Sequence, residues 1–350
     1  MRTERLELDV DGESTDIPEL IGRRVPDLVL VNDDDLAYAK IRLDQRSLGT
    51  ALAHPRGFQD SLPRALVLGA AWDMTRDAEM GARDFVKLVL ASLPGETDST
   101  LLRTLLAQLS ATLHLYVAPE HREQTTAETV AGLRDLATSA APGSDAQLQL
   151  VGAFAAQQRG ADHAAYLRDL LDGTQVLDGL AVDTDMRWRL LISLAASGAA
   201  TVEDIDAEQQ RDNTATGHER AEQARAAFPT AEAKATAWRR GVEEDGLTTT
   251  VLEAVAAGFG NVHDTSLLAP YVEKYHAMLD TVETKASHAV IEVLVRGFYP
   301  TALADAHLRD STQSWLTAHP EAPAAMRRLV AENRDPIARA LRAQQRDIDA

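Results

Sequence analysis

The sequence predicts a mainly α-helical protein, built as an irregular α-α superhelix and preceded by a small antiparallel β segment. Three observations lead to this fold class. Apolar residues recur every three to four positions from Ser61 onward, which is the period of a helix. Alanine dominates the apolar residues and aromatic residues make up only 5% of the chain, a composition typical of closely packed helices. Helix pairs recur at roughly 35 to 45 residues, the spacing of HEAT-like and armadillo-like arrays.

The first 45 residues differ in period from the rest of the chain, because apolar side chains near their start recur at every second position, which is the period of a strand. Leu6, Leu8 and Val10 alternate with charged residues up to an Asp-Gly hairpin signal. Four short strands are too few for a sandwich of their own. We therefore expect residues 1–45 to be the end of a β-sandwich-like domain whose earlier part lies outside this chain, and residues 46–350 to form a helical superhelix. The predicted strands are residues 5–10, 15–20, 26–31 and 36–43.

In the next part of the chain, helices are separated by proline and glycine signals. Residues 98–117 form the strongest amphipathic helix. Pro119 is expected to end it, and Thr125 with Glu128 forms a capping box for the following helix. The apolar stripe of the 98–117 helix consists of Leu101, Leu102, Leu105, Leu106, Leu109 and Leu113.

Residues 186–240 carry the clearest start and stop signals. Trp188 lies on the apolar stripe of a helix that Gly198 ends. Thr201 then caps the next helix, with an aspartate three residues later as its capping-box partner. A further helix ends at Pro229, and another begins directly after it. Each of these helices is too short to be stable alone, so all of them must pack on neighbours.

The helical pattern continues to the end of the sequence. A tight turn is expected at residues 297–300, and Asp335 followed by Pro336 predicts the start of a last helix. The chain as a whole predicts roughly fifteen helices joined by short loops. The apolar stripes of this part are Val251, Leu252, Val255 and Phe259, then Leu268, Tyr271, Val272, Tyr275 and Leu279, then Val290, Ile291, Leu294 and Val295.

Several short motifs occur in order along the whole chain. In this order they resemble the C-terminal region of the bacterial aminopeptidase N family, which are M1-type zinc metallopeptidases. The resemblance covers the end of their β-domain and their helical C-terminal domain. The motifs are Val31–Tyr38, Ile205–Glu208, Asp212–Gly217, Phe228–Trp238, Gly258-Phe259, Leu268–Val272, Phe298–Pro300 and Arg339–Gln344.

This resemblance implies a parent enzyme that releases N-terminal amino acids from peptides with one Zn²⁺. A zinc site of that kind needs an HExxH helix, and the sequence has no HExxH and no Gly-x-Met-Glu-Asn strand. The resemblance therefore assigns the zinc ligands and the catalytic base to an upstream catalytic domain, on which this chain packs. We expect no catalytic residue, cofactor or metal site in this chain, and no peptide hydrolysis by the chain alone. Its expected role is the lid and wall of the substrate chamber.

Three residues are candidates for facing the substrate. Arg296 precedes Phe298 and Tyr299 at the end of a predicted helix, beside a tight turn. Its guanidinium group is suited to a bidentate contact with a peptide carboxylate. The alternative is a purely structural role, in which the cation offsets the dipole at the C-terminal end of the helix.

Metal-ligating patterns are weak in this sequence. His288 and Glu292 are four residues apart and share a helix face, but two ligands do not make a zinc site. A surface ion pair explains the same spacing. The acidic run Asp33–Asp35 lacks the alternation and the central glycine of a calcium loop, so we interpret it as a solvated turn.

The net charge and the composition of the chain argue against several further classes of function. A net charge of −19 argues against binding to nucleic acid or to an anionic membrane surface. There are no cysteines, so disulfides and thiolate metal sites are excluded. The longest apolar runs fall short of the roughly 20 residues that a membrane helix needs. The N-terminal residues lack the apolar core of a signal peptide, so a cytoplasmic protein is expected.

A second hypothesis remains open at this point. The helical array is also compatible with a stand-alone α-solenoid scaffold that binds a protein or peptide partner on its concave face. This hypothesis leaves the N-terminal strands without a role, because a four-strand fragment has exposed edges.

Overall fold

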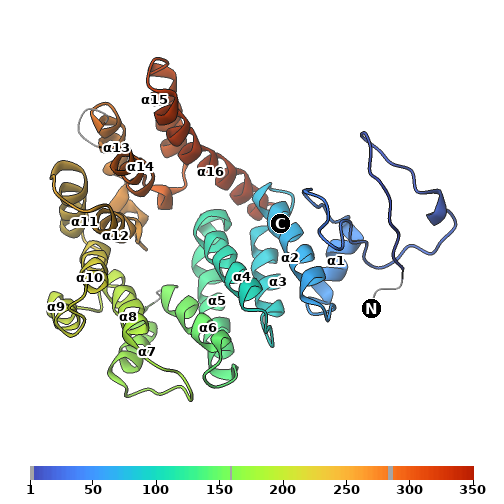
Figure 1. Cartoon of the computed structure of the whole chain (residues 1–350), viewed down its shortest axis with the longest axis horizontal. Coiled ribbons are helices and arrows are strands. Elements are labelled where there is room, and N and C mark those ends of the chain that lie inside the picture. The colour runs from blue at the N-terminus through green and yellow to red at the C-terminus, as the bar shows by residue number, and fades with distance from the viewer. Residues whose placement is uncertain (1–3, 158–159, 283–286) are drawn as a thin grey trace.

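The computed structural model describes residues 4–157, 160–282 and 287–350, and the regular structure in these ranges is entirely helical (Figure 1). The prediction of a mainly α-helical protein is confirmed. The sixteen α-helices in the described ranges are α1 (Gln45–Ala53), α2 (Ser61–Arg76), α3 (Ala82–Ser92), α4 (Ser99–Ala111), α5 (Pro119–Ser139), α6 (Asp145–Ala156), α7 (Gly160–Asp172), α8 (Thr184–Ala196), α9 (Val202–Arg211), α10 (Ala215–Ala227), α11 (Ala231–Trp238), α12 (Thr249–Gly260), α13 (Tyr271–Leu279), α14 (His288–Gly297), α15 (Ala306–Ala318) and α16 (Ala324–Ile348). Shorter elements are the 3-10 turns η1 (Pro18–Leu20), η4 (Thr265–Leu268) and η6 (Thr301–Leu303), and the π-helical turns η2 (Thr112–Tyr116) and η3 (Arg239–Glu243).

The α-helices form two layers. From α2 onward, each even-numbered helix packs on the next even-numbered helix, and α16 packs back on α2. In Figure 1 the helices α9, α11, α13 and α15 lie outside their even-numbered neighbours. The even-numbered helices therefore form an inner ring.

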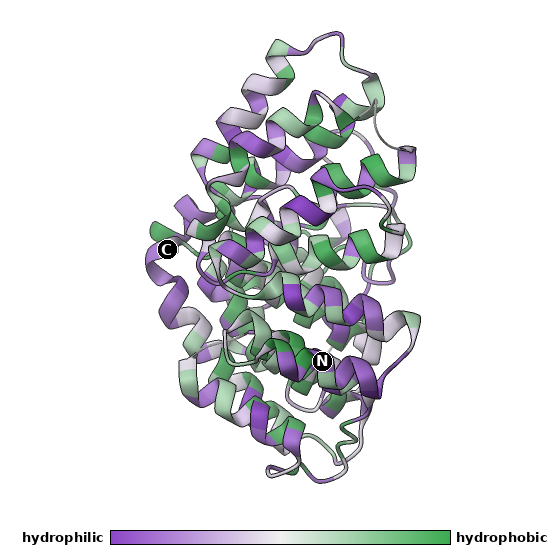
Figure 2. Cartoon of the chain, turned by 90° about the vertical axis from the view of Figure 1, so that its left-hand side faces the viewer, coloured by the Kyte–Doolittle hydropathy of each residue, from purple (hydrophilic) through white to green (hydrophobic). Residues whose placement is uncertain are grey.

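Packing between the layers buries one continuous apolar core. Most helices carry separate hydrophobic and hydrophilic bands along their length, as Figure 2 shows. Amphipathic helices of this kind bury their apolar face and expose their polar face to solvent. The largest fully buried side chains include Trp188, Tyr275, Phe85, Lys234, Phe259 and Phe298.

Residues 4–157, 160–282 and 287–350 contain no helix that could span a membrane. None of the helices in these ranges combines the length and the apolar character that crossing a bilayer requires.

The N-terminal segment differs from its prediction. Residues 4–44 contain no strand in this structure and run mostly without regular structure. Its alternating apolar side chains are exposed: Val10 is 79% exposed and Leu36 is 85% exposed. A strand needs a neighbouring strand to pair its backbone groups, and the four predicted segments do not pair with one another. The segment joins the core in its second half, where Leu28 and Leu30 pack against it and Ile41 and Leu43 are buried.

Two prolines act differently from their predicted roles. Pro119 is the first residue of α5, a position whose N–H would have no partner in any case. Thr125 consequently lies inside α5 and donates to the His121 carbonyl oxygen (2.8 Å) instead of capping a helix. Pro336 lies within α16, which continues past it to Ile348. The proline removes one helical hydrogen bond, but α16 is held along its length by contacts with α14, α15 and η2.

Candidate functional site

The three residues predicted to face the substrate lie where α14 ends. Arg296 is in the last turn of α14, and its side chain is half exposed. It forms ion pairs with Glu292 of the same helix (3.1 Å) and with Glu332 of α16 (2.9 Å). Arg296 therefore links the last turn of α14 to α16, its neighbour among the even-numbered helices.

Phe298 is fully buried behind Arg296. Its ring packs against Trp238 (5.8 Å between centroids) and Phe259 (5.3 Å). A Cβ atom at Gly241, in the π-helical turn η3, would overlap this ring, so the glycine makes room for it. Phe298 therefore anchors the end of α14 to α11 and α12 and does not reach solvent in this structure.

Tyr299 is also buried, within a polar network. Thr312 donates its hydroxyl hydrogen to the Leu308 carbonyl oxygen, so the Tyr299 hydroxyl donates to Thr312 Oγ1 (3.0 Å). Burial raises the pKa of Tyr299 to about 12. The neighbouring Tyr275 donates to the Val295 carbonyl oxygen (2.9 Å), which ties the last turn of α14 to α13.

The structure therefore brings the three residues together at one site, with Arg296 as the exposed member. The two aromatic residues fix the backbone that presents the guanidinium group. Substrate contact by any of the three stays a prediction.

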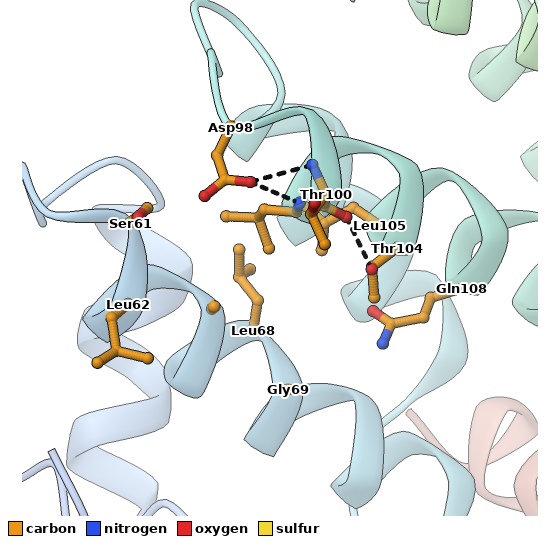
Figure 3. Close-up of a pocket in the computed structure, with 11 residues that line it drawn as sticks. Ser61, Leu62, Leu68, Gly69, Asp98, Thr100, Thr104, Leu105 and Gln108 are labelled. Carbon is orange, nitrogen blue, oxygen red and sulfur yellow. Dashed lines mark hydrogen bonds between the residues drawn. The ribbon is translucent and has the colours of Figure 1, made fainter. Parts of the chain in front are cut away.

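A second feature is a shallow pocket between α2 and α4 (Figure 3), with a volume of about 290 Å³. Its walls are mostly apolar, and Asp98 lies at one end, where its Oδ1 accepts the Thr100 and Leu101 backbone N–H groups (both 3.0 Å). At the other end, Gln108 Oε1 is buried and has no hydrogen-bond partner among the described residues. The apolar lining consists of Leu62, Ala65, Leu68, Leu101 and Leu105.

Three of the even-numbered helices also carry exposed basic side chains. Arg103 of α4, Arg189 of α8 and Arg220 of α10 are exposed. A Cβ atom at Gly152 of α6 would lie 2.9 Å from Arg189 Nη1, so the missing side chain lets Arg189 lie across α6. The sequence alone does not single out these residues, because the exposed side of a helix is known only once its neighbours are placed.

The described residues do not fit a zinc site. Among residues 4–157, 160–282 and 287–350, no group of three His, Cys, Asp or Glu side chains is close enough to hold a metal ion. Glu292, the one potential partner of His288 on its helix face, is paired with Arg296. A catalytic zinc needs three protein ligands, and these residues do not supply them.

The family profile of the ERAP1-like C-terminal domain matches residues 28–339. The chain belongs to this family. It is also 46% identical to the aminopeptidase N of Streptomyces lividans, in an alignment that covers 100% of this chain and 41% of that protein. The chain thus spans about two fifths of the length of this relative. The resemblance predicted from the ordered motifs is confirmed.

Two of the motifs that carry the family resemblance, Ile205–Glu208 and Asp212–Gly217, bind side chains of α8. Trp188 Nε1 of α8 donates to Asp212 Oδ2 (2.9 Å) at the end of α9. A Cβ atom at Gly217 would overlap the Asp212 carbonyl oxygen, so the Asp-Asn-Thr-x-x-Gly turn needs glycine there. Arg187 donates to both carboxylate oxygens of Glu208, from Nε (2.8 Å to Oε1) and from Nη2 (2.6 Å to Oε2). These motif residues therefore have structural partners.

Lys234 is the most unusual residue of these family motifs, because its side chain is fully buried. Its Nζ donates to the carbonyl oxygens of Ala226 (2.8 Å), Gly258 (2.9 Å) and Asn261 (3.2 Å), at the C-terminal ends of α10 and α12. Three carbonyl acceptors match the three N–H donors of an ammonium group. Burial opposes the charge and lowers the pKa of Lys234 to about 7. The residue acts as a shared cap for two helix ends.

Proposed function

We propose that this chain is the substrate-chamber wall of an M1-type zinc aminopeptidase, and that the metal and the catalytic groups come from another part of the polypeptide. The observation that carries the proposal is the 46% identity to an aminopeptidase N along the whole chain, matched to only 41% of that protein. The absence of a metal-ligand set among the described residues is compatible with it. A ring of helices that confines a peptide would exclude water and orient the peptide N-terminus.

We further propose that residues 1–45 complete a β-sandwich-like domain and that residues 46–350 form the helical domain. The exposed apolar residues of the N-terminal segment would then be covered by strands from the rest of the β-domain. The segment already has a fixed end on the helical side, where the Val29 N–H donates to Ser47 Oγ (2.9 Å) and Thr50 Oγ1 donates to the Asp27 carbonyl oxygen (2.6 Å).

Arg296 is the residue through which we propose a direct peptide contact. Its guanidinium group is held by Glu292 and Glu332, and a peptide carboxylate would take the place of one of them. Phe298 and Tyr299 would support this contact from the core. The proposed partners are a peptide and an upstream catalytic domain. A cytoplasmic location stays a prediction.

The test uses the Streptomyces lividans relative as the source of the missing part. That aminopeptidase N is truncated to remove the region matched by this chain, and the two pieces are purified separately and mixed. We expect this chain alone to release no arylamine from aminoacyl-arylamides in the presence of zinc. We expect the mixture to associate and to hydrolyse peptides.

Two outcomes would contradict the proposal. Chelator-sensitive hydrolysis by this chain alone would place the catalytic zinc site within it. A mixture that neither associates nor gains activity would favour the scaffold hypothesis. Arg296→Ala in the mixture tests the peptide contact separately, and it should weaken peptide binding without preventing association.

A further inference from the structure

The ring of inner helices closes between its first and last members. The C-terminal end of α16 lies beside α2 and α3 in Figure 1, and it packs on α2, α3 and η2. Every other contact between successive inner helices joins parts of the chain that are close in sequence. At the closure, Asp347 of α16 contacts Arg83 and Ala118, which are 264 and 229 positions away from it in the sequence. The closure is therefore the place where the ring is held only by noncovalent contacts between distant segments.

One buried carboxylate dominates this contact. Asp347 of α16 is fully buried. Its Oδ1 accepts the Arg83 backbone N–H (2.9 Å), and its Oδ2 accepts the Ala118 backbone N–H (3.0 Å). These N–H groups belong to the N-terminal ends of α3 and α5. The N-cap residues of these helices, Gly81 and Ala118, provide no side-chain cap of their own.

Asp347 thus supplies from the last turn of α16 the caps that two early helices lack. An anionic group at two helix N-termini is also favoured by both helix dipoles. The Arg83 side chain reinforces the contact, because its Nη2 donates to the Asp347 carbonyl oxygen (2.5 Å). A Cβ atom at Gly81 would lie 2.8 Å from the Ala350 Cβ, so the close approach of the two segments requires glycine.

A second side chain of α16 bridges the same contact. Gln344 Nε2 donates to the Leu115 carbonyl oxygen (2.8 Å) and to the Ala304 carbonyl oxygen (3.3 Å). Leu115 lies in the π-helical turn η2, and a π turn shifts the hydrogen-bond register of a helix. Gln344 therefore links η2 to the segment that precedes α15.

We propose that the last turns of α16 are a latch that closes the helical ring, with Asp347 as its central residue. Release of the latch opens the contact between α16 and α3, while the rest of the array stays joined by its loops and outer helices. The latch determines how wide the enclosed face is. This inference concerns the ring itself, so it holds or fails independently of the proposed aminopeptidase function.

The test measures the width of the ring in the whole chain. The natural sequence has no cysteine, so Lys87→Cys on α3 and Arg342→Cys on α16 allow two spin labels to be attached at defined sites. In Asp347→Asn, we expect a longer and broader label-to-label distance distribution than in the otherwise natural sequence, with an unchanged helical circular-dichroism spectrum. Asp349→Asn is the matched control, because Asp349 is exposed and should leave the distribution unchanged.

An unchanged distribution in folded Asp347→Asn would overturn the latch. Should that variant not fold, hydrogen exchange of the natural chain decides the question. If the latch opens, the backbone N–H groups of Arg83 and Ala118 exchange together with those of residues 344–348. This exchange occurs at a lower denaturant concentration than the exchange of the N–H groups of α8 and α10. Exchange of these groups only with global unfolding would overturn it.

Discussion

Two regions of this molecule have equally regular sequence patterns and reach different structures. The N-terminal segment alternates apolar and polar residues, but its apolar side chains face solvent, as Ile21 shows with 83% exposure. Residues 186–240 follow helical signals, and their large side chains are buried, with Trp188 at 1% and Trp238 at 3% exposure. Most apolar side chains of the first region have no partner among the described residues, whereas the large side chains of the second region are buried against neighbouring helices.

The difference follows from where each type of structure finds its hydrogen bonds. A helix satisfies its own backbone, so a helical segment forms its shape before it packs. A strand satisfies its backbone only on a neighbour. An exposed segment of alternating apolar residues therefore indicates a surface that another strand would cover. The predictions below test how far the stability of each region depends on its packing partners.

The largest loss of stability is expected when Lys234 is replaced. Lys234→Met should lower the free energy of unfolding by about 3 to 5 kcal/mol, because three buried carbonyl oxygens lose their donor. Urea unfolding followed by circular dichroism measures this change. Lys87→Met is the matched control, since Lys87 is exposed, and it should change the free energy by less than about 0.5 kcal/mol. Equal effects of the two substitutions would contradict the capping role of Lys234.

The second largest loss of stability is expected when the ion pair between Arg187 of α8 and Glu208 of α9 is broken. Glu208→Gln keeps the shape of the side chain but removes the charge that Arg187 needs, and both groups are largely buried. We expect a loss of about 2 to 3 kcal/mol in the free energy of unfolding. Glu244→Gln removes the partner of Arg239 in an exposed pair and should cost less than about 1 kcal/mol. A smaller effect at Glu208 than at Glu244 would show that the first pair does not hold the layers together.

The pH dependence of stability tests the charge of Lys234. Its pKa is lowered from 10.5 to about 7 in the folded chain, whereas the unfolded chain keeps the ordinary value. Between these two values the unfolded state binds one more proton, so the free energy of unfolding rises with pH, by at most about 1.4 kcal/mol per pH unit. Below about pH 7 both states are protonated, and Lys234 contributes no slope.

The measurement compares urea unfolding of the natural chain and of Lys234→Met from about pH 6 to about pH 9. The difference between the two curves should change above about pH 7 and stay constant below it. Parallel curves over the whole range would mean that the carbonyl oxygens keep Lys234 protonated throughout.

Features of the fold that depend on neighbouring residues could be predicted from the sequence. Thr201 and Asp204 form the expected capping box, and Gly198 ends its helix with a positive φ of 74°. Pro119 and Pro336 were assigned wrong roles, because the same residue is tolerated at a helix start and, where packing compensates, within a helix.

Features that depend on distant residues could not be predicted. Asp347 and Arg83 are 264 positions apart, and no local signal relates them. Arg296 could be named as a candidate from its place at a helix end, but its partner Glu332 could not. The four predicted N-terminal strands are the opposite case. Their local pattern is clear, but residues 4–44 do not supply the partner that a strand requires.

The smallest change in stability is expected at Leu36 of the N-terminal segment, and Leu43 of the same segment is its buried counterpart. Leu36 is 85% exposed and Leu43 is 5% exposed. Leu36→Ala should change the free energy of unfolding by less than about 0.5 kcal/mol, whereas Leu43→Ala should lower it by about 2 to 4 kcal/mol. If residues 1–45 do complete a β-domain, Leu36→Ala should become destabilising once that domain is attached. A substantial loss at Leu36 in this chain alone would mean that the segment already has a partner.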